Sequence, residues 1–372
     1  MRIGKQKMNK RPEKPERRTF RVVGLPGDGI GPEVYASAIR VLAVLKETHG
    51  LDIQLDEQLI GGSAIDATGD PLPQATIDAC HNADAALLGA VGGPRWDGNP
   101  ADKRPELGLL RIRAEFNLFC NLRPIVTHPA LHSFSPIRPE RLKNVDLMIV
   151  RELTGGSYFG KKWRNDNEAE DVCRYTREEV ERVTRAAARI AQQRDRRITL
   201  VDKANVLETS RLWRAVASRV VAEEFPDVQM EYMYVDAAAM HLLTRPAEFD
   251  VMLTENLFGD ILSDEASMLC GSLGLLPSAS LNEEQFGLYE PVHGSAPDIA
   301  GQDKANPYAM LLSVAMMLRH SLGCETEAAA LERCIHQCWI DGVLTADLHP
   351  DGYSTTAITD AVCKRLSGAA PA

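Results

Sequence analysis

Two aspartates separated by one helical turn are the residues of this chain whose types and spacing point most directly to chemistry. Asp260 and Asp264 follow the short apolar run 251–254, and the residues after it carry apolar side chains at helical spacing. This pattern predicts a helix with both carboxylates on one face near its N-terminus. Carboxylates held side by side favour a cation between them, and Mg²⁺ and Mn²⁺ prefer such oxygen ligands. A second interpretation stays open, because acidic residues near a helix N-terminus also stabilise the helix dipole.

Three arginines, Arg113, Arg123 and Arg151, lie close to apolar segments and are candidates for binding an anion. Arginine holds a carboxylate through two parallel hydrogen bonds, which makes it the usual residue for this task. Leu109 and Leu110 precede Arg113 by four and three residues on a predicted helix, so all three share one face. Ordinary surface ion pairs would explain the same arginines equally well.

Two further charged residues stand at the ends of predicted strands. Lys203 follows the apolar run 198–202, and Asp236 follows 230–235. Catalytic groups in α/β proteins often lie at the carboxyl ends of strands, and a lysine there can take part in proton transfer. Position alone does not separate this role from that of a solvated lysine.

Two glycine-rich loops resemble nucleotide-binding motifs but fail their tests. In the first, which begins at Gly27, the third glycine of a dinucleotide fingerprint would fall on Pro32. The second, 155–162, has the spacing of a phosphate-binding P-loop but places Lys162 where a Ser or Thr hydroxyl is required. A Rossmann fold of the usual kind and a P-loop phosphotransferase are therefore both disfavoured.

A third loop, 293–298, remains a candidate for phosphate or ribose binding. Its small residues allow a phosphate to approach the backbone, and Asp298 offers a carboxylate to ribose hydroxyls. Such a carboxylate would also repel a 2′-phosphate, which favours NAD over NADP. A plain turn explains the loop equally well.

Composition limits the class of protein. The formal net charge of −10 argues against general nucleic-acid binding, and no apolar run has the length of a membrane span. The eight cysteines are scattered without a zinc-binding pattern, which indicates free thiols in a reducing compartment, so we expect a soluble cytoplasmic protein. Residues 1–19 form a basic tail that we expect to be disordered; RNA binding through this tail is an alternative.

Short apolar runs alternate with longer amphipathic ones along the rest of the chain, which predicts an α/β fold with much parallel pairing. The predicted buried strands are 22–25, 85–91, 145–150, 198–201, 230–235 and 251–254. The predicted helices are 32–48, 177–194, 207–225 and 258–273, with a mostly helical region from 319 to the C-terminus.

Several ordered motifs together resemble one family, the metal-dependent β-decarboxylating dehydrogenases, which include the isocitrate and isopropylmalate dehydrogenases. The motifs are 25–33, 92–97, 108–113, 121–124, 150–156, 202–208, 256–264 and 290–298. The resemblance extends from about Phe20 to the C-terminus. It implies two α/β domains in the fold of that family rather than a Rossmann fold. The first, cofactor-binding domain would combine 20–118 with 271–372, and the second, 119–270, would dimerise and bind metal.

The resemblance also implies a role for individual residues. The implied substrate-binding residues are Arg113, Arg123, Arg151, Asp236, Leu109 and Leu110. The implied metal ligands are Asp236, Asp260 and Asp264, and the implied acid–base residues are Tyr158 and Lys203. The implied NAD-binding residues are Glu106, His293, Gly294, Ser295, Ala296, Pro297, Asp298 and Asn306. Glu255 is an extra acid beside the metal pair, and we expect it to point to solvent.

The implied activity is NAD-dependent oxidation and decarboxylation of 3-isopropylmalate to 4-methyl-2-oxopentanoate and CO₂ in leucine biosynthesis, with Mg²⁺ or Mn²⁺. The enzyme would be a homodimer with shared active sites, in which Lys203 and Asp236 come from the partner subunit. Homoisocitrate, tartrate and isocitrate are alternative substrates. An isocitrate enzyme, however, would be expected to place a polar residue where Leu109 and Leu110 stand.

Overall fold

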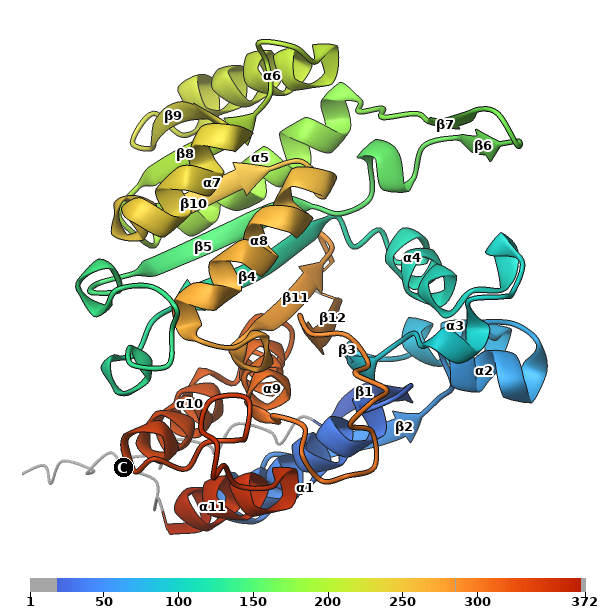
Figure 1. Cartoon of the computed structure of the whole chain (residues 1–372), viewed down its shortest axis with the longest axis vertical. Coiled ribbons are helices and arrows are strands. Elements are labelled where there is room, and N and C mark those ends of the chain that lie inside the picture. Colours follow the sequence, from blue (N-terminus) through green and yellow to red (C-terminus); the bar gives the residue numbers. More distant parts are fainter. Residues whose placement is uncertain (1–18, 285, 369–372) are drawn as a thin grey trace, which may run out of the picture.

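A ten-stranded mixed sheet forms the centre of the molecule, with helices on both of its faces (Figure 1). The computed structural model describes residues 19–284 and 286–368. The strand order is β2-β1-β3-β12-β11-β4-β5-β10-β8-β9, and β6 and β7 form a separate hairpin. The basic tail predicted at 1–19 lies outside the described residues except for Thr19, whose hydroxyl donates to Asp52.

The strands of the large sheet are β1 (Phe20–Gly27), β2 (Ile53–Glu57), β3 (Ala85–Ala90), β4 (Cys120–Val126), β5 (Asp146–Glu152), β8 (Arg197–Asp202), β9 (Gln229–Tyr234), β10 (Val251–Thr254), β11 (Pro277–Leu281) and β12 (Gly287–Pro291). The hairpin consists of β6 (Lys162–Arg164) and β7 (Ala169–Asp171). The helices are α1 (Gly31–His49), α2 (Gly61–Thr68), α3 (Gln74–His81), α4 (Pro105–Glu115), α5 (Arg177–Gln192), α6 (Glu208–Glu224), α7 (Val235–Thr244), α8 (Asn256–Cys270), α9 (Tyr308–His320), α10 (Glu325–Ile340) and α11 (Thr355–Gly368).

The sheet has two halves that differ in their origin along the chain. Strands β2, β1, β3, β12 and β11 come from 20–118 and 271–372, and the other five come from 119–270. The halves meet where β11 pairs antiparallel with β4 over only three residue pairs. This arrangement supports the predicted division into two domains, which remains a prediction. The larger apolar core runs through both halves, so they share their main hydrophobic contacts.

The α/β class is confirmed, and each predicted strand and helix overlaps an observed one. The prediction that 230–235 is buried is wrong, because β9 forms the edge of the sheet and, among the described residues, pairs with β8 alone. Tyr232 and Tyr234 on this strand are exposed. Val235 does not belong to the strand either, since α7 begins at this residue.

The glycine-rich turn that fails the dinucleotide test has a structural role. Gly27 and Gly29 have positive φ values of 73° and 58°, which residues with side chains rarely adopt. Between them, the buried Asp28 carboxylate accepts hydrogen bonds from the backbone N–H groups of Gly62 (2.7 Å), Ser63 (2.8 Å) and Gly92 (2.9 Å). The turn therefore fixes the start of α2 and the segment after β3 rather than a phosphate.

Two further sequence expectations can be compared with the structure. No helix within the described ranges is long and apolar enough to cross a bilayer. All eight cysteines lie in the described part and are free thiols, as expected; Cys173 is the exposed one.

Candidate active site

Arginines and acids from four elements meet beside α8. Arg113 lies on α4, Arg123 on β4 and Arg151 near the end of β5, while Asp260 and Asp264 lie on α8. Helix α8 crosses the face of the sheet over β4 and β5 (Figure 1), which brings its carboxylates to both strands. The structure thus places together five residues that the sequence analysis had singled out separately.

Arg151 is the most completely buried of these charges, at 1% exposure. Its Nε and Nη2 both donate to Oδ1 of Asn256, at 3.0 and 2.8 Å, and its Nη1 pairs with Oδ1 of Asp260. Burial and, to a smaller extent, the neighbouring charge of Arg123 lower the pKa of Arg151 to about 10. Because a buried guanidinium is costly without partners, Asn256 and Asp260 are needed to hold it.

Arg123 and Arg113 are also buried and paired. Arg123 Nη1 donates to the hydroxyl of Ser263 at 2.6 Å, and the same guanidinium forms ion pairs with Asp264 at 3.3 Å and with Asp260 at 3.5 Å. Arg113 pairs with Glu290 at 2.9 Å, and its Nε has no hydrogen-bond partner among the described residues. These contacts exclude the interpretation of the arginines as ordinary surface pairs.

The two aspartates differ in their electrostatic environment. Burial acts to raise the pKa of Asp260, but the charges of Arg151 and Arg123 and a hydrogen bond from Tyr158 outweigh it, so the net shift is downward. Burial raises the pKa of Asp264, and the adjacent charge of Asp260 adds to this rise. The ion pair with Arg123 offsets this rise only in part, so a bound cation would further favour the ionised form of Asp264.

The predicted position of the aspartates near the helix N-terminus is only partly right. Helix α8 begins at Asn256, which places Asp260 in its second turn and Asp264 in its third. Glu255 is the N-cap residue and accepts a hydrogen bond from Phe258 N–H at 3.1 Å. The acid that satisfies the helix terminus is thus Glu255, and the dipole interpretation of the two aspartates is excluded.

The expectation that Glu255 points to solvent is wrong. Its side chain is buried, and burial raises its pKa. The hydroxyl of Tyr175 donates to Glu255 at 2.9 Å and accepts from the backbone N–H of Asn256 at 3.0 Å. Sequence reasoning missed this pair, although an acid directly before a helix that follows a strand is a recognisable capping signal.

Tyr158 lies next to the acidic pair and is suited to donate a proton. Its hydroxyl donates to Oδ2 of Asp260 at 2.6 Å, and the Arg151 guanidinium lies 5.6 Å from its ring centroid. Burial, together with the hydrogen bond and charge of Asp260, raises the pKa of Tyr158 to about 12. The phenol is therefore protonated at neutral pH.

Lys203 and Asp236 lie together, but apart from the metal candidates. Lys203 follows β8, Asp236 lies in the first turn of α7, and the two side chains form an ion pair. Asp236 is exposed, and its pKa is lowered by the hydrogen bond from Lys203. No group of three or more acidic, His or Cys side chains suited to a metal exists in the described part of one chain, so Asp236 does not complete the set with Asp260 and Asp264.

The candidate cofactor loop 293–298 contacts the Gly27 turn. The N–H of Ile30 donates to the carbonyl of Ser295 at 2.8 Å, and Ala296 adopts a positive φ of 36°. Residues held in such conformations cluster at ligand sites. The Nε2 of His293 is buried and has no hydrogen-bond partner among the described residues, which leaves a polar atom for a ligand to satisfy.

Two other residues were predicted to bind the cofactor: Asn306, which precedes α9, and Glu106, which lies on α4. Asn306 is buried; its side chain accepts from Tyr308 N–H at 3.0 Å and donates to Asp347 at 3.1 Å. The first of these bonds satisfies the backbone N–H of the first residue of α9. Glu106 is exposed in the first turn of α4, and its carboxylate lies against Gly92.

Leu109 and Leu110 are both half-buried on α4, the helix that carries Arg113. Leu109 packs partly against a smaller apolar core that includes Ile112 and Leu118. Leu110 is not part of the buried clusters, which leaves its side chain available to a ligand.

The near-miss P-loop does not have the structure of one. Gly156–Tyr158 form a single 3₁₀ turn, and strand β6 rather than a helix follows at Lys162. The carbonyl of Gly155 instead accepts a hydrogen bond from the side chain of Asn256 at 3.0 Å. The phosphotransferase alternative is therefore wrong.

Comparison with known proteins gives consistent matches over nearly the whole chain. The isocitrate/isopropylmalate dehydrogenase family model matches residues 21–362. A 3-isopropylmalate dehydrogenase of Heyndrickxia coagulans is 53% identical over 93% of this chain and 96% of its own length, and one of Bacillus subtilis (strain 168) is 55% identical over 92% and 96%. The crystal structure of isocitrate dehydrogenase from Methylococcus capsulatus superposes with a TM-score of 0.83 at 35% identity, covering 94% of this chain and 100% of that one.

We predict that Asp260→Asn destabilises the fold by about 3 kcal/mol, because the buried Arg151 loses its charge partner. Asp264→Asn on the same helix should cost less than about 1 kcal/mol, since Asp264 is largely exposed. Urea unfolding at neutral pH measures both changes. Because the pKa of Asp260 is lowered on folding, the difference between wild type and Asp260→Asn should be present above about pH 4 and disappear as the pH falls below it. Equal costs for the two variants would contradict the assigned pairing.

Proposed function

The chain belongs to the isocitrate/isopropylmalate dehydrogenase family, and we propose that it oxidises and decarboxylates 3-isopropylmalate with NAD⁺ in leucine biosynthesis. One observation carries the proposal: three buried arginines gather beside α8, where Arg123 and Arg151 pair with its carboxylates and Arg113 pairs with Glu290. Three carboxylates, those of Glu290, Asp260 and Asp264, balance their charge. A divalent cation would therefore leave the site with two positive charges, which a dicarboxylate dianion neutralises.

3-Isopropylmalate differs from isocitrate in the group that it carries beside its two shared carboxylates: an isopropyl group instead of a third carboxylate. Leu110, one turn from Arg113 on α4, offers an apolar contact to an isopropyl group, whereas a third carboxylate would be unpaired there. The relatives named 3-isopropylmalate dehydrogenase also share more of the sequence than the isocitrate enzyme does, at 53–55% against 35% identity. Both points favour 3-isopropylmalate over isocitrate.

Asp260 and Asp264 fit a divalent cation such as Mg²⁺ or Mn²⁺. They offer hard oxygen ligands on one helix face, and the side chain of Asp264 is exposed there, so a cation from solution can reach it. Asp236 of a partner subunit would complete the set. When bound, the cation lowers the pKa of the substrate hydroxyl and stabilises the negative charge that develops on the substrate oxygen during decarboxylation.

The loop 293–298 fits NAD⁺, which accepts the hydride from C2 of the substrate when bound. The buried and unpartnered Nε2 of His293 and the positive φ of Ala296 both suit a loop shaped for a ligand. Asp298 would accept hydrogen bonds from the ribose hydroxyls and disfavour a 2′-phosphate. Glu106 and Asn306 border the same site in this proposal.

Two residues of the chain serve proton transfer in the proposed reaction. Lys203 of the partner subunit, once its amine has given its own proton to solvent, takes the proton from the substrate hydroxyl, directly or through water. Tyr158 is protonated at neutral pH and lies beside Asp260, so it can deliver a proton to the substrate carbon once CO₂ has left. The arginines meanwhile hold both carboxylates and so fix the orientation of C2.

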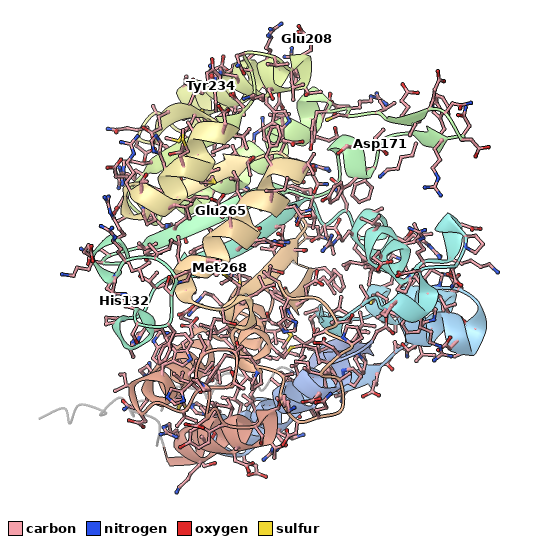
Figure 2. The ribbon with its side chains drawn as sticks, in the orientation of Figure 1. His132, Asp171, Glu208, Tyr234, Glu265 and Met268 are labelled. Carbon is pink, nitrogen blue, oxygen red and sulfur yellow. The ribbon has the colours of Figure 1, made fainter. Side chains whose placement is uncertain are left out.

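The proposed assembly is a homodimer with shared active sites. Large apolar side chains are exposed on the adjacent helices α7 and α8, among them Met240 and Ile261, each 59% exposed, and Met268. Figure 2 shows Met268 and Glu265 on the outer side of α8. Burial of such a surface against a second copy would bring the exposed Lys203–Asp236 pair of one chain towards α8 of the other.

The proposal also includes the two domains predicted from the family, 20–118 with 271–372 and 119–270, which correspond to the two halves of the sheet. The eight free cysteines support a reducing compartment, and we place the enzyme in the cytoplasm.

The direct test is an assay of NAD⁺ reduction. We expect turnover with 3-isopropylmalate and Mg²⁺ or Mn²⁺, much less with isocitrate or malate, and loss of activity on addition of EDTA. NADP⁺ in place of NAD⁺ should give a much lower kcat/KM, because Asp298 repels a 2′-phosphate. Preferential turnover of isocitrate, or full activity in EDTA, would contradict the proposed substrate or metal site.

Leu110→Ser should lower kcat/KM for 3-isopropylmalate by about tenfold or more while changing kcat/KM for malate little, because malate lacks the isopropyl group. The ratio of the two values within one variant is the internal control for damage to the fold. Leu109→Ser should also lower thermal stability, since Leu109 packs against the smaller core. Equal losses on both substrates would contradict an apolar wall at Leu110.

Mixing two inactive chains tests whether the site is shared. A Lys203→Met chain and an Asp260→Asn chain should each be inactive, and allowing their dimers to exchange should restore activity to about a quarter of wild type. Random exchange makes half of the dimers mixed, and each mixed dimer keeps one of its two sites intact. If exchange is verified by mass and no activity returns, the site lies within one chain.

A further inference from the structure

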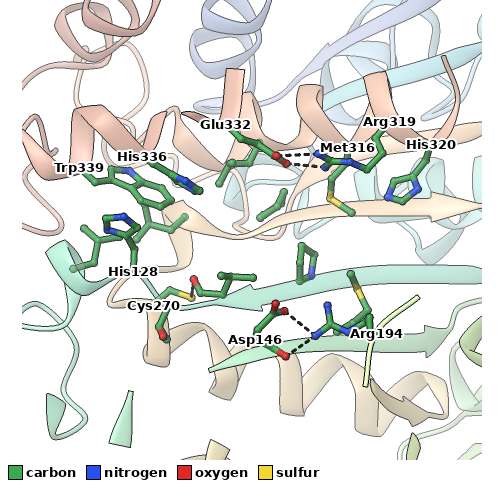
Figure 3. Close-up of a pocket in the computed structure, with 18 residues that line it drawn as sticks. His128, Asp146, Arg194, Cys270, Met316, Arg319, His320, Glu332, His336 and Trp339 are labelled. Carbon is green, nitrogen blue, oxygen red and sulfur yellow. Dashed lines mark hydrogen bonds and ion pairs between the residues drawn. The ribbon is translucent and has the colours of Figure 1, made fainter. Parts of the chain in front are cut away.

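A cavity of about 370 Å³ lies between the two halves of the sheet, away from the arginine cluster. One wall comes from β4, β5 and the turn after α5, and the opposite wall comes from α9 and α10 (Figure 3). This volume would hold roughly a dozen water molecules at about 30 Å³ each, and it is within the range of ligand pockets. The proposed reaction uses none of the residues that line it.

The cavity and the active site lie on opposite faces of the same two strands. Side chains alternate along a strand, so Arg123 and Pro124 of β4 point to opposite faces of the sheet. The same holds for Arg151 and Met148 of β5, which are an odd number of residues apart. Arg123 and Arg151 bind the α8 carboxylates, whereas Pro124 and Met148 line the cavity.

Each charged residue that lines the cavity already forms an ion pair. Arg194 pairs with Asp146 and Asp250, both at 2.7 Å, and Arg319 pairs with Glu325 at 2.8 Å and Glu332 at 2.7 Å. Three histidines, His128, His320 and His336, also line the cavity. Burial lowers the pKa of His320 to about 4. Burial also lowers the pKa values of His128 and His336. The arginines therefore offer no free positive charge to an anionic ligand, and each of the four carboxylates, which outnumber the two arginines, is already held by one of them.

One end of the cavity is aromatic and carries an unused donor. His128, His336 and Trp339 gather there, with ring centroids 4.9 to 5.6 Å apart (Figure 3). Trp339 is 6% exposed, and its Nε1–H has no acceptor among the described residues. A buried donor without a partner is costly, and a ligand that carries an acceptor would remove that cost. The middle of the cavity is apolar, with side chains such as Leu312 and Met316.

We propose that this cavity is a binding site for a small, uncharged molecule with an aromatic ring and one hydrogen-bond acceptor. The ring lies against the aromatic end, and the indole of Trp339 turns so that its buried Nε1–H reaches the acceptor. Such a molecule contacts both halves of the sheet. On β4 and β5 it packs against the face opposite to the one that carries Arg123 and Arg151. Its binding therefore changes the geometry of the arginine cluster.

Acetophenone and ethylbenzene form a matched pair of probes, because they differ chiefly in the carbonyl acceptor. Titration of the full-length protein, followed by ligand-observed NMR, should give a dissociation constant on the order of 1 mM for acetophenone, and severalfold weaker binding for ethylbenzene. Trp339→Phe keeps the ring and removes the donor, so it should abolish the preference. Equal binding of the two probes to wild type would overturn the assigned acceptor contact.

Two variants locate the binding. Met316→Trp fills the middle of the cavity and should reduce acetophenone binding at least tenfold. Because Met316 is buried and the replacement could disturb the fold, Val126→Trp serves as a second blocking variant at a position that is 50% exposed and lines the cavity. Ile340→Trp adds the same bulk at an exposed neighbouring position that does not line the cavity, and should leave binding unchanged. Undiminished binding to Val126→Trp would overturn the proposed location.

The effect on the active site rests on the proposed function and is measured separately. Saturating acetophenone should change KM or kcat for 3-isopropylmalate by at least twofold in wild type and leave both unchanged in Val126→Trp. Identical constants with and without the probe in wild type would overturn the coupling. If no turnover occurs even without the probe, the proposed function fails, while the binding measurements, which need no turnover, stand.

Discussion

Burial of the Arg151 charge is the constraint on which the rest of the site depends. A guanidinium at 1% exposure must be surrounded by acceptors, and both of its partners, Asn256 and Asp260, come from the first two turns of α8. The helix can approach this closely because residue 259 is glycine: a Cβ there would lie 2.7 Å from Cγ of Arg151. Glu255 and Tyr175 fix where the helix begins, so a chain of buried hydrogen bonds determines the position of Asp260 and, one turn later, of Asp264.

The proposed active site and the proposed cavity site share strands β4 and β5. These two strands pair antiparallel over seven residue pairs in the middle of the sheet, so neither strand can shift without the other. Their alternate side chains serve the arginine cluster on one face and the cavity on the other. A change in packing against Pro124 or Met148 is therefore transmitted to the strands that carry Arg123 and Arg151, because a close-packed sheet has few ways to absorb it.

Sequence reasoning could identify the α/β class and most of the charged site residues, because strand runs and acid or arginine spacing are local signals. It could not place β11 and β12, since these strands have small or polar residues such as Ser278 and Ser280 whose burial depends on distant segments. The edge position of β9 was missed because its composition matches that of a buried strand. Asn256 and Ser263 were missed as arginine ligands because a polar residue on a helix acquires that role only when the strands arrive beneath it.

The charge balance of the site also bears on how its ligands would bind. In one chain the three arginines are matched by Glu290, Asp260 and Asp264, and the exposed Lys203–Asp236 pair is neutral by itself, so bringing in the pair from a partner subunit keeps the total at zero. On the proposed assignment, a divalent cation alone would leave two uncompensated positive charges in a partly buried site, and a dianion alone would leave two negative ones. Each ligand therefore reduces the cost of binding the other, and the coupling between them must be equal in both directions. Cation and substrate should for this reason enter the site as a pair.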